Sequence, residues 1–388
     1  MTRVIASGDA VGLTRLLVRQ DSRNPSLVAD APGEGPVARA LAAVLREWGF
    51  AVELSEVSPG RPNVIARLGP AGGGTLILNG HLDTVGVEGM THPPFDAQDR
   101  DGMLYGRGSA DMKGGVAAMC AATARAAAAN ALRCEVIVAA VTDEEYESEG
   151  TRALIASGVR ADAAIVTEPT RLAIAPAHRG FAWIEINVRG RAAHGSRYDI
   201  GVDAIRKAAL VLAELDAHER NVLTARTHRL LGHASLHAST ISGGIGWSTY
   251  PDRCVVRLER RTLPGETAEG ALAEVHEACD RIRLRGVEID ADAALMFAQG
   301  PSDVADDAPI VRALSRALEA CGEAVNIEGL SAWTDAALLN DAGIPAICYG
   351  PGDISLAHSA TEWVPIGEIE RATTVLERLV REWPEERR

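Results

Sequence analysis

The stretch TLILNGHLDT, residues 75–84, decides the fold of this chain. Its apolar half is short and ends at the turn pair Asn79-Gly80, which is typical of a buried strand in a parallel sheet. Ligands of such sheets gather beyond the carboxyl ends of the strands. We therefore expect His81 and Asp83, which follow this strand, to lie where a site would form.

Three further segments with strand character, residues 136–141, 163–166 and 346–349, also lead into polar residues. A glycine-rich turn at 106–111 adds an acid as it enters an alanine-rich helix predicted over 114–132. Taken singly, most acids and histidines in such places belong to solvated loops. Because parallel strands end at one edge of a sheet, these residues are expected to meet. The further candidate site residues are Asp111, Glu144, Glu145, Glu168 and His358.

The composition is that of an ordinary globular protein, with 47% hydrophobic and 24% charged residues among 388. The formal net charge of −14 speaks against a nucleic-acid partner, which needs a basic footprint. No apolar stretch reaches the length of a bilayer span, and the first residues lack the apolar core of a signal peptide. Six scattered cysteines without a Cys-x-x-Cys pair favour a reducing compartment, so we expect a cytoplasmic protein.

The first part of the chain has the pattern of an α/β domain with a largely parallel sheet. Apolar residues at helical spacing predict helices over 11–20 and 35–48, and edge strands are expected at 51–57 and 63–68. The glycine-rich loop at 69–74 precedes its strand, whereas a dinucleotide fingerprint must follow one. A dinucleotide site is therefore not expected.

The pattern changes after residue 177. Strict alternation of apolar and polar residues at 181–189 and 253–261 predicts an antiparallel sheet with one covered face. Two helices with apolar stripes would cover it. These stripes are Val202, Ile205, Ala209 and Leu212, then Leu272, Val275, Cys279 and Ile282. We predict a β-α-β-β-α-β domain at 178–297, inserted into a catalytic domain formed by residues 1–177 and 298–388, where a helix near 310–321 and a last helix at 366–383 follow.

The charges of the candidate ligands indicate two metal ions. Asp111, Glu145 and Glu168 carry three negative charges, which two divalent ions and one bridging hydroxide would balance. Oxygen and imidazole donors without thiolate suit zinc, with cobalt or manganese as alternatives. The adjacent residues Glu144 and Glu145 point in different directions, so one can bind metal while the other, free of metal, acts as general base.

The motifs resemble the acetylornithine deacetylase / succinyl-diaminopimelate desuccinylase family, which also contains aminoacylases and carboxypeptidases. The likeness covers nearly the whole chain, in order. It implies a di-zinc domain interrupted by a lid domain that usually dimerises. The motifs are GHLDTV (80–85), GRGSADMKGG (106–115), TDEE (142–145), TEPT (167–170) and GPG (350–352) with His358.

The resemblance also implies roles for single residues. Asp111 would bridge the metals, His81 and Glu168 would hold one ion, and Glu145 and His358 the other. Glu144 resembles the general base, and Asp83 the carboxylate that orients His81.

Two segments of the inserted domain resemble family motifs as well. In GRAAHGS (190–196), His194 would stabilise the tetrahedral oxyanion, often from the partner subunit. In RTLPGE (261–266), Arg261 would bind the substrate α-carboxylate. The position two before this arginine is commonly aspartate and is Glu259 here, and residues 247–250 lack the family's usual asparagine. Both departures concern specificity.

The sequence therefore predicts a deacylase of N-acyl amino acids, similar to acetylornithine deacetylase, that works by attack of a metal-bridging hydroxide. A dipeptidase, aminopeptidase or carboxypeptidase with the same site is the alternative. A metal-free binding protein is the rival from another class. A serine hydrolase is not expected, because neither Ser109 nor Ser196 sits in a Gly-x-Ser-x-Gly elbow. We expect a small-molecule substrate and a homodimer formed through the lid. The role of His178 stays open.

Overall fold

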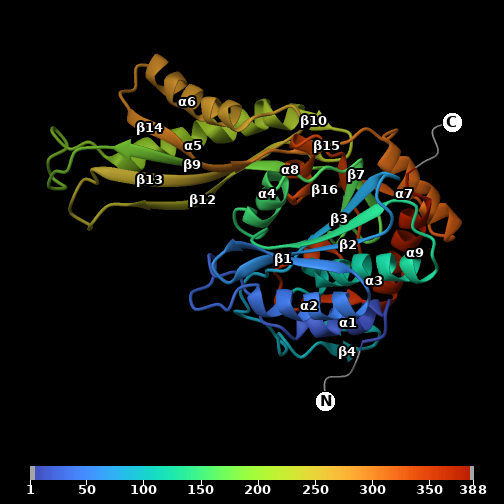
Figure 1. Ribbon diagram of the computed structural model, residues 1–388. Coiled ribbons are helices and arrows are strands. Elements are labelled where there is room, and N and C mark those ends of the chain that lie inside the picture. The colour runs from blue at the N-terminus through green and yellow to red at the C-terminus, as the bar shows by residue number, and fades with distance from the viewer. Residues whose placement is uncertain (1–4, 385–388) are drawn as a thin grey trace. The chain divides into compact units, whose positions relative to one another are not determined.

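The computed structural model describes residues 5–384, which form two compact units (Figure 1). The first unit runs to Pro176 and continues through Val304–Glu328 and from Thr334 onward. The second unit comprises Ala177–Asp303 and Gly329–Trp333. Along the chain, the second unit thus interrupts the first.

The main sheet of the first unit has the order β1-β2-β6-β3-β7-β17-β8. Its four central strands, β6, β3, β7 and β17, are parallel, whereas β1, β2 and β8 pair antiparallel, so the predicted α/β class with a mostly parallel sheet is confirmed. β1 lies at the edge as predicted, but β2 pairs with β1 and β6 and is not an edge strand. The strands are β1 (Ala51–Ser58), β2 (Arg61–Leu68), β3 (Thr75–His81), β6 (Glu135–Val141), β7 (Ala163–Val166), β8 (Ile174–His178) and β17 (Ala346–Cys348).

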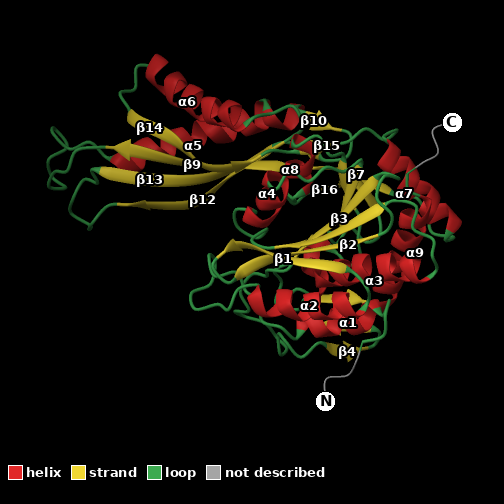
Figure 2. Cartoon of the chain, in the orientation of Figure 1, coloured by secondary structure: helices red, strands yellow, loops and turns green. Residues whose placement is uncertain are grey.

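Helices cover both faces of this sheet (Figure 2). α1, α2, α3 and α9 lie on one face, and α4 and α8 on the other. The alanine-rich α3 approaches closely, because a Cβ at Gly115 would stand 2.0 Å from the carbonyl oxygen of Thr167. The helices are α1 (Ala10–Val18), α2 (Gly35–Glu47), α3 (Gly114–Ala128), α4 (Glu149–Ala156), α7 (Pro309–Ala320), α8 (Ala336–Asp341) and α9 (Ile366–Glu382). Smaller elements are β4 (Gln98–Arg100), β5 (Met103–Tyr105), β15 (Ser302–Asp303), β16 (Ile327–Leu330), β18 (Trp363–Pro365) and the short helical turns Ser109–Lys113 and Ile354–Leu356.

The second unit contains an antiparallel sheet of order β12-β13-β9-β14, with α5 and α6 packed on one face. The alternation predicted for residues 181–189 is confirmed, because Ala182, Ile184, Ile186 and Val188 all lie in the core between sheet and helices. Its elements are β9 (Gly180–Arg189), α5 (Ala204–Asn221), β10 (Thr227–His228), β11 (Gly232–His233), β12 (Ser235–Gly243), β13 (Arg253–Thr262), α6 (Ala268–Leu284), β14 (Asp290–Gln299) and a turn at Leu223–Ala225.

The stripe predicted for α5 is wrong for Ile205 and Ala209, whereas Leu212 is partly buried against the core and Val202 precedes the helix. Ile205 is 40% exposed, and Ala209 is exposed as well. The buried face has small residues close to the sheet. Apolar residues at helical spacing occur on two faces of α5, so spacing alone could not show which face is buried. Its members are Ala204, Ala208, Val211, Leu215 and His218. The stripe predicted for α6 is confirmed for Val275, Cys279 and Ile282, with Leu272 partly buried beside them.

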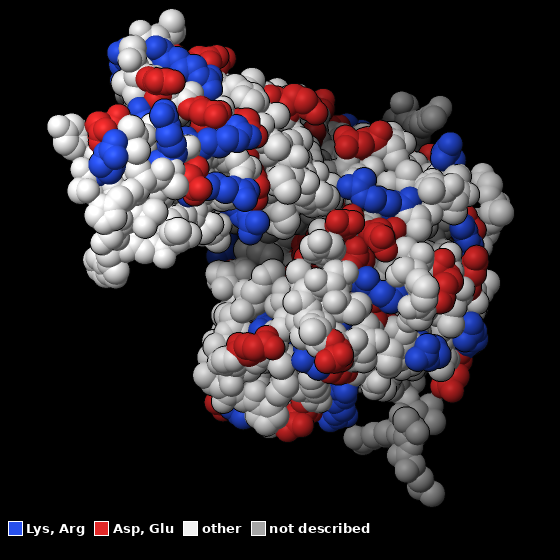
Figure 3. All heavy atoms as spheres, turned by 90° about the vertical axis from the view of Figure 1, so that its left-hand side faces the viewer, with Lys and Arg blue, Asp and Glu red and all other residues white. Residues whose placement is uncertain are grey.

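Charged side chains of both signs are interspersed over the face drawn in Figure 3. Within residues 5–384, the structure contains no helix that is both long and apolar enough to cross a bilayer. All six cysteines are free thiols, and all but Cys321 are buried.

Candidate metal centre

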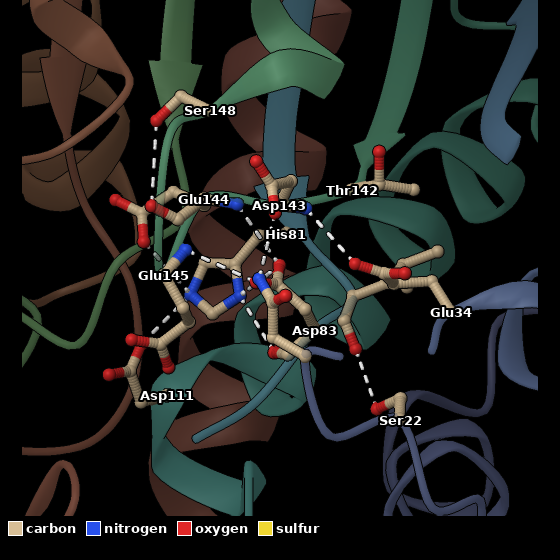
Figure 4. A network of polar contacts seen from close by, with 12 residues as sticks. Ser22, Glu34, His81, Asp83, Asp111, Thr142, Asp143, Glu144, Glu145 and Ser148 are labelled. Atoms are coloured by element: carbon tan, nitrogen blue, oxygen red, sulfur yellow. Dashed lines mark hydrogen bonds and ion pairs between the residues drawn. The ribbon is translucent and has the colours of Figure 1, made fainter. Parts of the chain in front are cut away.

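The predicted ligands gather at the carboxyl edge of the parallel strands. Figure 4 shows His81, Asp111 and Glu145 there. His81 is the last residue of β3, Glu144 and Glu145 follow β6, and Glu168 follows β7. His358 lies in the loop after β17, and Asp111 in the turn that leads into α3. The common strand direction brings these distant segments to one place.

Asp111 lies between the two imidazoles. Its Oδ1 is 3.0 Å from His81 Nε2, and its Oδ2 is 3.5 Å from His358 Nε2. His358 Nε2 also lies 2.9 Å from Glu145 Oε2. A carboxylate that presents one oxygen to each of two histidines has the arrangement that a bridging ligand needs.

Two groups of donor atoms are close enough to hold a metal ion each. One consists of His81, Asp111 and Glu145, and the other of His81, Glu144 and Glu168, with the atoms of each group within 4.8 Å of one another. The second group contains Glu144, whose Oε2 is 3.9 Å from His81 Nε2. The assignment of Glu168 as a ligand and Glu144 as the base therefore stays a prediction.

Asp83 is fully buried and contacts more of the site than the sequence suggested. Its carboxylate accepts hydrogen bonds from the backbone N–H groups of Glu144 (3.2 Å) and Glu145 (3.1 Å) and from Asn24 Nδ2 (2.9 Å). His81 Nδ1 lies 3.0 Å from the Asp83 carbonyl oxygen and 3.5 Å from its carboxylate. A proton on Nδ1 leaves the lone pair of Nε2, on the side of Asp111, available to a metal ion. Asp83 thus orients both the histidine and the acidic pair.

The charges at this edge call for cations. Burial raises the pKa of Glu144 and of Glu168 well above the ordinary value, and neighbouring acids add to the effect. Burial would lower the pKa of His81, but its hydrogen bonds to Asp111 and Asp83 outweigh this and raise it. Hydrogen bonds to Asp111 and Glu145 raise the pKa of His358 to about 10. The raised pKa values of Glu144, Glu168, His81 and His358 all favour added positive charge, so the donor set fits divalent metal ions.

Glu362 is a buried residue of this site that sequence reasoning missed. Its carboxylate accepts hydrogen bonds from the backbone N–H groups of Gly108, Ala110 and Asp111 at 3.0–3.1 Å. It also pairs with Arg107, whose Nη1 is 2.7 Å away. Glu362 therefore fixes the turn that carries Asp111, and only its position shortly after His358 could have drawn attention to it.

A second missed network surrounds Asp143. Arg61 bonds Glu34 at 2.7 Å and Asp143 at 2.9 Å, and Asn24 donates to Asp143 at 3.0 Å. Figure 4 shows Glu34 and Asp143 beside the site. Asp143 begins an acidic run that composition alone would place in solvent, yet it is 2% exposed. This network anchors the first residue of the segment that carries Glu144.

Asp335 is the third missed acid. It is buried, accepts a hydrogen bond from Thr151 Oγ1 at 2.6 Å, and burial raises its pKa to about 6. It follows no predicted strand, so no local signal marked it.

Three sequence candidates lie in the second unit. His194 is exposed, with Nδ1 2.9 Å from Ser196 Oγ. Arg261 lies at the end of β13 and pairs with Glu259 at 2.6 Å. The roles of both stay predictions. His178 is buried, its Nδ1 lies 3.0 Å from the Arg179 carbonyl oxygen, and burial lowers its pKa to about 4, so the ring is neutral at pH 7.

Comparison with known proteins agrees with this geometry. The model of peptidase family M20/M25/M40 matches residues 77–382. An acetylornithine deacetylase from Myxococcus xanthus is 32% identical over 87% of this chain and 89% of its own length. A deformylase of N-formyl-4-amino-5-aminomethyl-2-methylpyrimidine from Bacillus subtilis is 29% identical over 88% of each chain. The crystal structure of aminopeptidase PepT from Bacillus cereus has a TM-score of 0.78 at 22% identity, over 98% of this chain and 99% of that one. The predicted resemblance is confirmed: this chain belongs to peptidase family M20/M25/M40.

Proposed function

We propose that this chain is a dinuclear metal amidohydrolase that removes the acyl group from an N-acyl amino acid. The observation that carries the proposal is the Asp111 carboxylate, which faces one histidine with each oxygen among buried glutamates. Asp111 would bridge two ions, zinc in the first instance with cobalt or manganese as alternatives. His81 and Glu168 would hold one ion, and Glu145 and His358 the other.

When bound, the metal ions supply Lewis-acid activation of water and of the amide carbonyl. Glu144 accepts the proton from the attacking water and returns it to the leaving amine. Asp83 holds the backbone of Glu144, so the base has a fixed position. Arg261 binds the α-carboxylate of the substrate, and His194 stabilises the oxyanion.

The named relatives support the choice of reaction. One is an acetylornithine deacetylase and another a deformylase, and both names describe removal of an acyl group from nitrogen. The aminopeptidase with a similar fold favours the alternative, a dipeptidase, aminopeptidase or carboxypeptidase that uses the same site. We also propose a cytoplasmic protein, in keeping with its free thiols, and a homodimer formed through residues 178–297, the proposed lid domain.

The role of Glu144 is tested by Glu144→Gln in the zinc-loaded protein. We expect kcat for an N-acyl amino acid to fall by about 10²–10⁴-fold, because the amide cannot accept a proton. Metal content, measured by atomic emission, should stay at two ions per chain. Full activity in this variant would remove Glu144 as the base.

Two further variants complete the test. Glu145→Gln should lower the metal content, because it removes a proposed ligand. Glu147→Gln, a change in an exposed glutamate of the same loop, should alter neither quantity. A panel of N-acetyl and N-succinyl amino acids and dipeptides separates the deacylase from the peptidase.

A further inference from the structure

Four aromatic side chains gather in the second unit beside the end of β9. Ala182 and Ile184 of β9 face the core under α5 and α6, so Phe181 and Trp183 point to the opposite face of the sheet. Trp183 pairs with Phe297 across the strands, and their ring centroids are 5.6 Å apart. Phe181 lies 5.2 Å from Trp183, 5.9 Å from Phe297 and, edge-on, 6.4 Å from Trp333. We call Phe181, Trp183, Phe297 and Trp333 the aromatic platform.

Arg261 is fixed directly beside this platform. Its guanidinium carbon lies 5.5 Å from the centroid of the Phe181 ring. Its Nε donates to one oxygen of Glu259 at 2.6 Å, and the other oxygen accepts from Trp183 Nε1 at 2.9 Å. The glutamate that replaces the family's usual aspartate thus ties the arginine to the aromatic platform.

The free groups at this place can receive a carboxylate and an uncharged ring. Among residues 5–384, no hydrogen bond uses the two terminal nitrogens of Arg261, which form a fork suited to a carboxylate. Trp183 leaves 39% of its surface exposed, so the aromatic platform is open on one side. The exposed part of Trp183 is available to pack against the ring of a ligand.

The local charge disfavours a cationic side chain. Burial and the neighbouring Arg261 both lower the pKa of Arg179, which places a second guanidinium close by. None of the carboxylates in the described chain pairs with Arg179, and both oxygens of Glu259 are already engaged. Two guanidinium groups therefore lie near each other, with the Glu259 carboxylate bonded to Arg261 and Trp183, and an ammonium group would be repelled.

We propose that the aromatic platform and Arg261 select N-acyl amino acids whose side chain is aromatic. The proposal rests on the proposed function. The α-carboxylate and the side chain branch from one carbon, so a carboxylate held by Arg261 brings the side chain to the neighbouring rings. An aromatic pair adds about two- to tenfold in binding beyond simple burial, and burial of the ring adds more.

The test compares three substrates that differ only in side chain, with the zinc-loaded full chain. We expect kcat/KM for N-acetyl-L-phenylalanine to exceed that for N-acetyl-L-alanine by about tenfold or more, with N-acetyl-L-ornithine the poorest. Trp183→Ala should lower kcat/KM for N-acetyl-L-phenylalanine about tenfold and change kcat/KM for N-acetyl-L-alanine by less than about twofold. Trp183→Phe keeps a ring and should retain most of the preference. Leu284→Ala, an exposed apolar residue of the same unit outside the aromatic platform, should leave all three values unchanged.

Each outcome has a distinct meaning. The alanine substrate could be hydrolysed while kcat/KM for the ornithine substrate equals or exceeds that for the phenylalanine substrate. That result would overturn the aromatic preference and leave the proposed amidohydrolase activity intact. An equal loss on all three substrates in Trp183→Ala, with an unchanged melting temperature, would show that the aromatic platform does not read the side chain. No hydrolysis of any N-acyl amino acid by the metal-loaded protein would overturn the proposed function itself.

Discussion

Asp111 owes its position to the backbone of its turn. The backbone amide groups of Gly108, Ala110 and Asp111 in that turn donate to one buried carboxylate, Glu362, and Arg107 balances its charge. A charged acceptor bonds amide donors more strongly than a neutral one. The residue that places the central ligand is therefore about 250 positions away in sequence.

Glu362→Gln tests this dependence. The amide still accepts hydrogen bonds, but it leaves Arg107 buried without an anion, which costs about 3–5 kcal/mol of unfolding free energy. Metal affinity should fall about 10–100-fold, because the support of a ligand is weakened. Urea unfolding and a competitive zinc titration measure the two effects. Glu370→Gln, an exposed glutamate of α9, serves as the control, and equal results for both variants would show that Glu362 does not position the turn.

Among the elements, α5 shows how a helix packs against a sheet through its smaller residues. Alanines at 204 and 208 allow close approach, and Val211 and Leu215 fill the space beyond them. The larger Ile205 and Leu210 remain on the outer side, each about 40% exposed. The volume of the side chains at the contact, rather than their hydrophobicity alone, decides which face of α5 is buried.

Leu215→Ala and Leu210→Ala remove the same atoms from opposite sides of α5. Leu215 is 1% exposed, so its truncation leaves a cavity and should cost about 2–5 kcal/mol of unfolding free energy. Leu210 is 41% exposed, and its truncation should stay within about 0.5 kcal/mol. Chemical denaturation measures both. A larger loss in Leu210→Ala than in Leu215→Ala would contradict the burial of the Leu215 side of α5.

The elements that sequence reasoning predicts well are those with a local cause. The central strands and the helices that flank them follow from apolar periods within each segment, and strand ends mark His81, Glu144 and Glu168 because the cause is the strand itself. Glu362 and Asp335 have partners far along the chain, so no nearby pattern identifies them. Burial of such acids is decided by tertiary packing.

At the scale of the whole molecule, the metal centre concentrates part of a large negative charge in the interior of the first unit. The formal net charge is −14, and Asp335 and the glutamates at the site lie buried near one another. Without cations, burial and mutual repulsion raise the pKa of Glu144, Glu145, Glu168 and Asp335. Protons then take the place of the missing positive charge.

The chelated protein should therefore lose stability as pH rises. Above the ordinary carboxyl pKa of about 4, the folded state holds protons that the unfolded chain has released, so the free energy of unfolding falls with pH. Asp335, with a pKa of about 6, contributes this slope between about pH 4 and 6, and Glu144 and Glu168, whose pKa values are raised further, extend it upward. Zinc at 100 times its dissociation constant should add about 2.7 kcal/mol and flatten the slope, because ions replace the protons. Melting temperatures between pH 5 and 8, with chelator and with zinc, measure this. If the melting temperature has the same dependence on pH with chelator and with zinc, the buried acids do not form the metal centre.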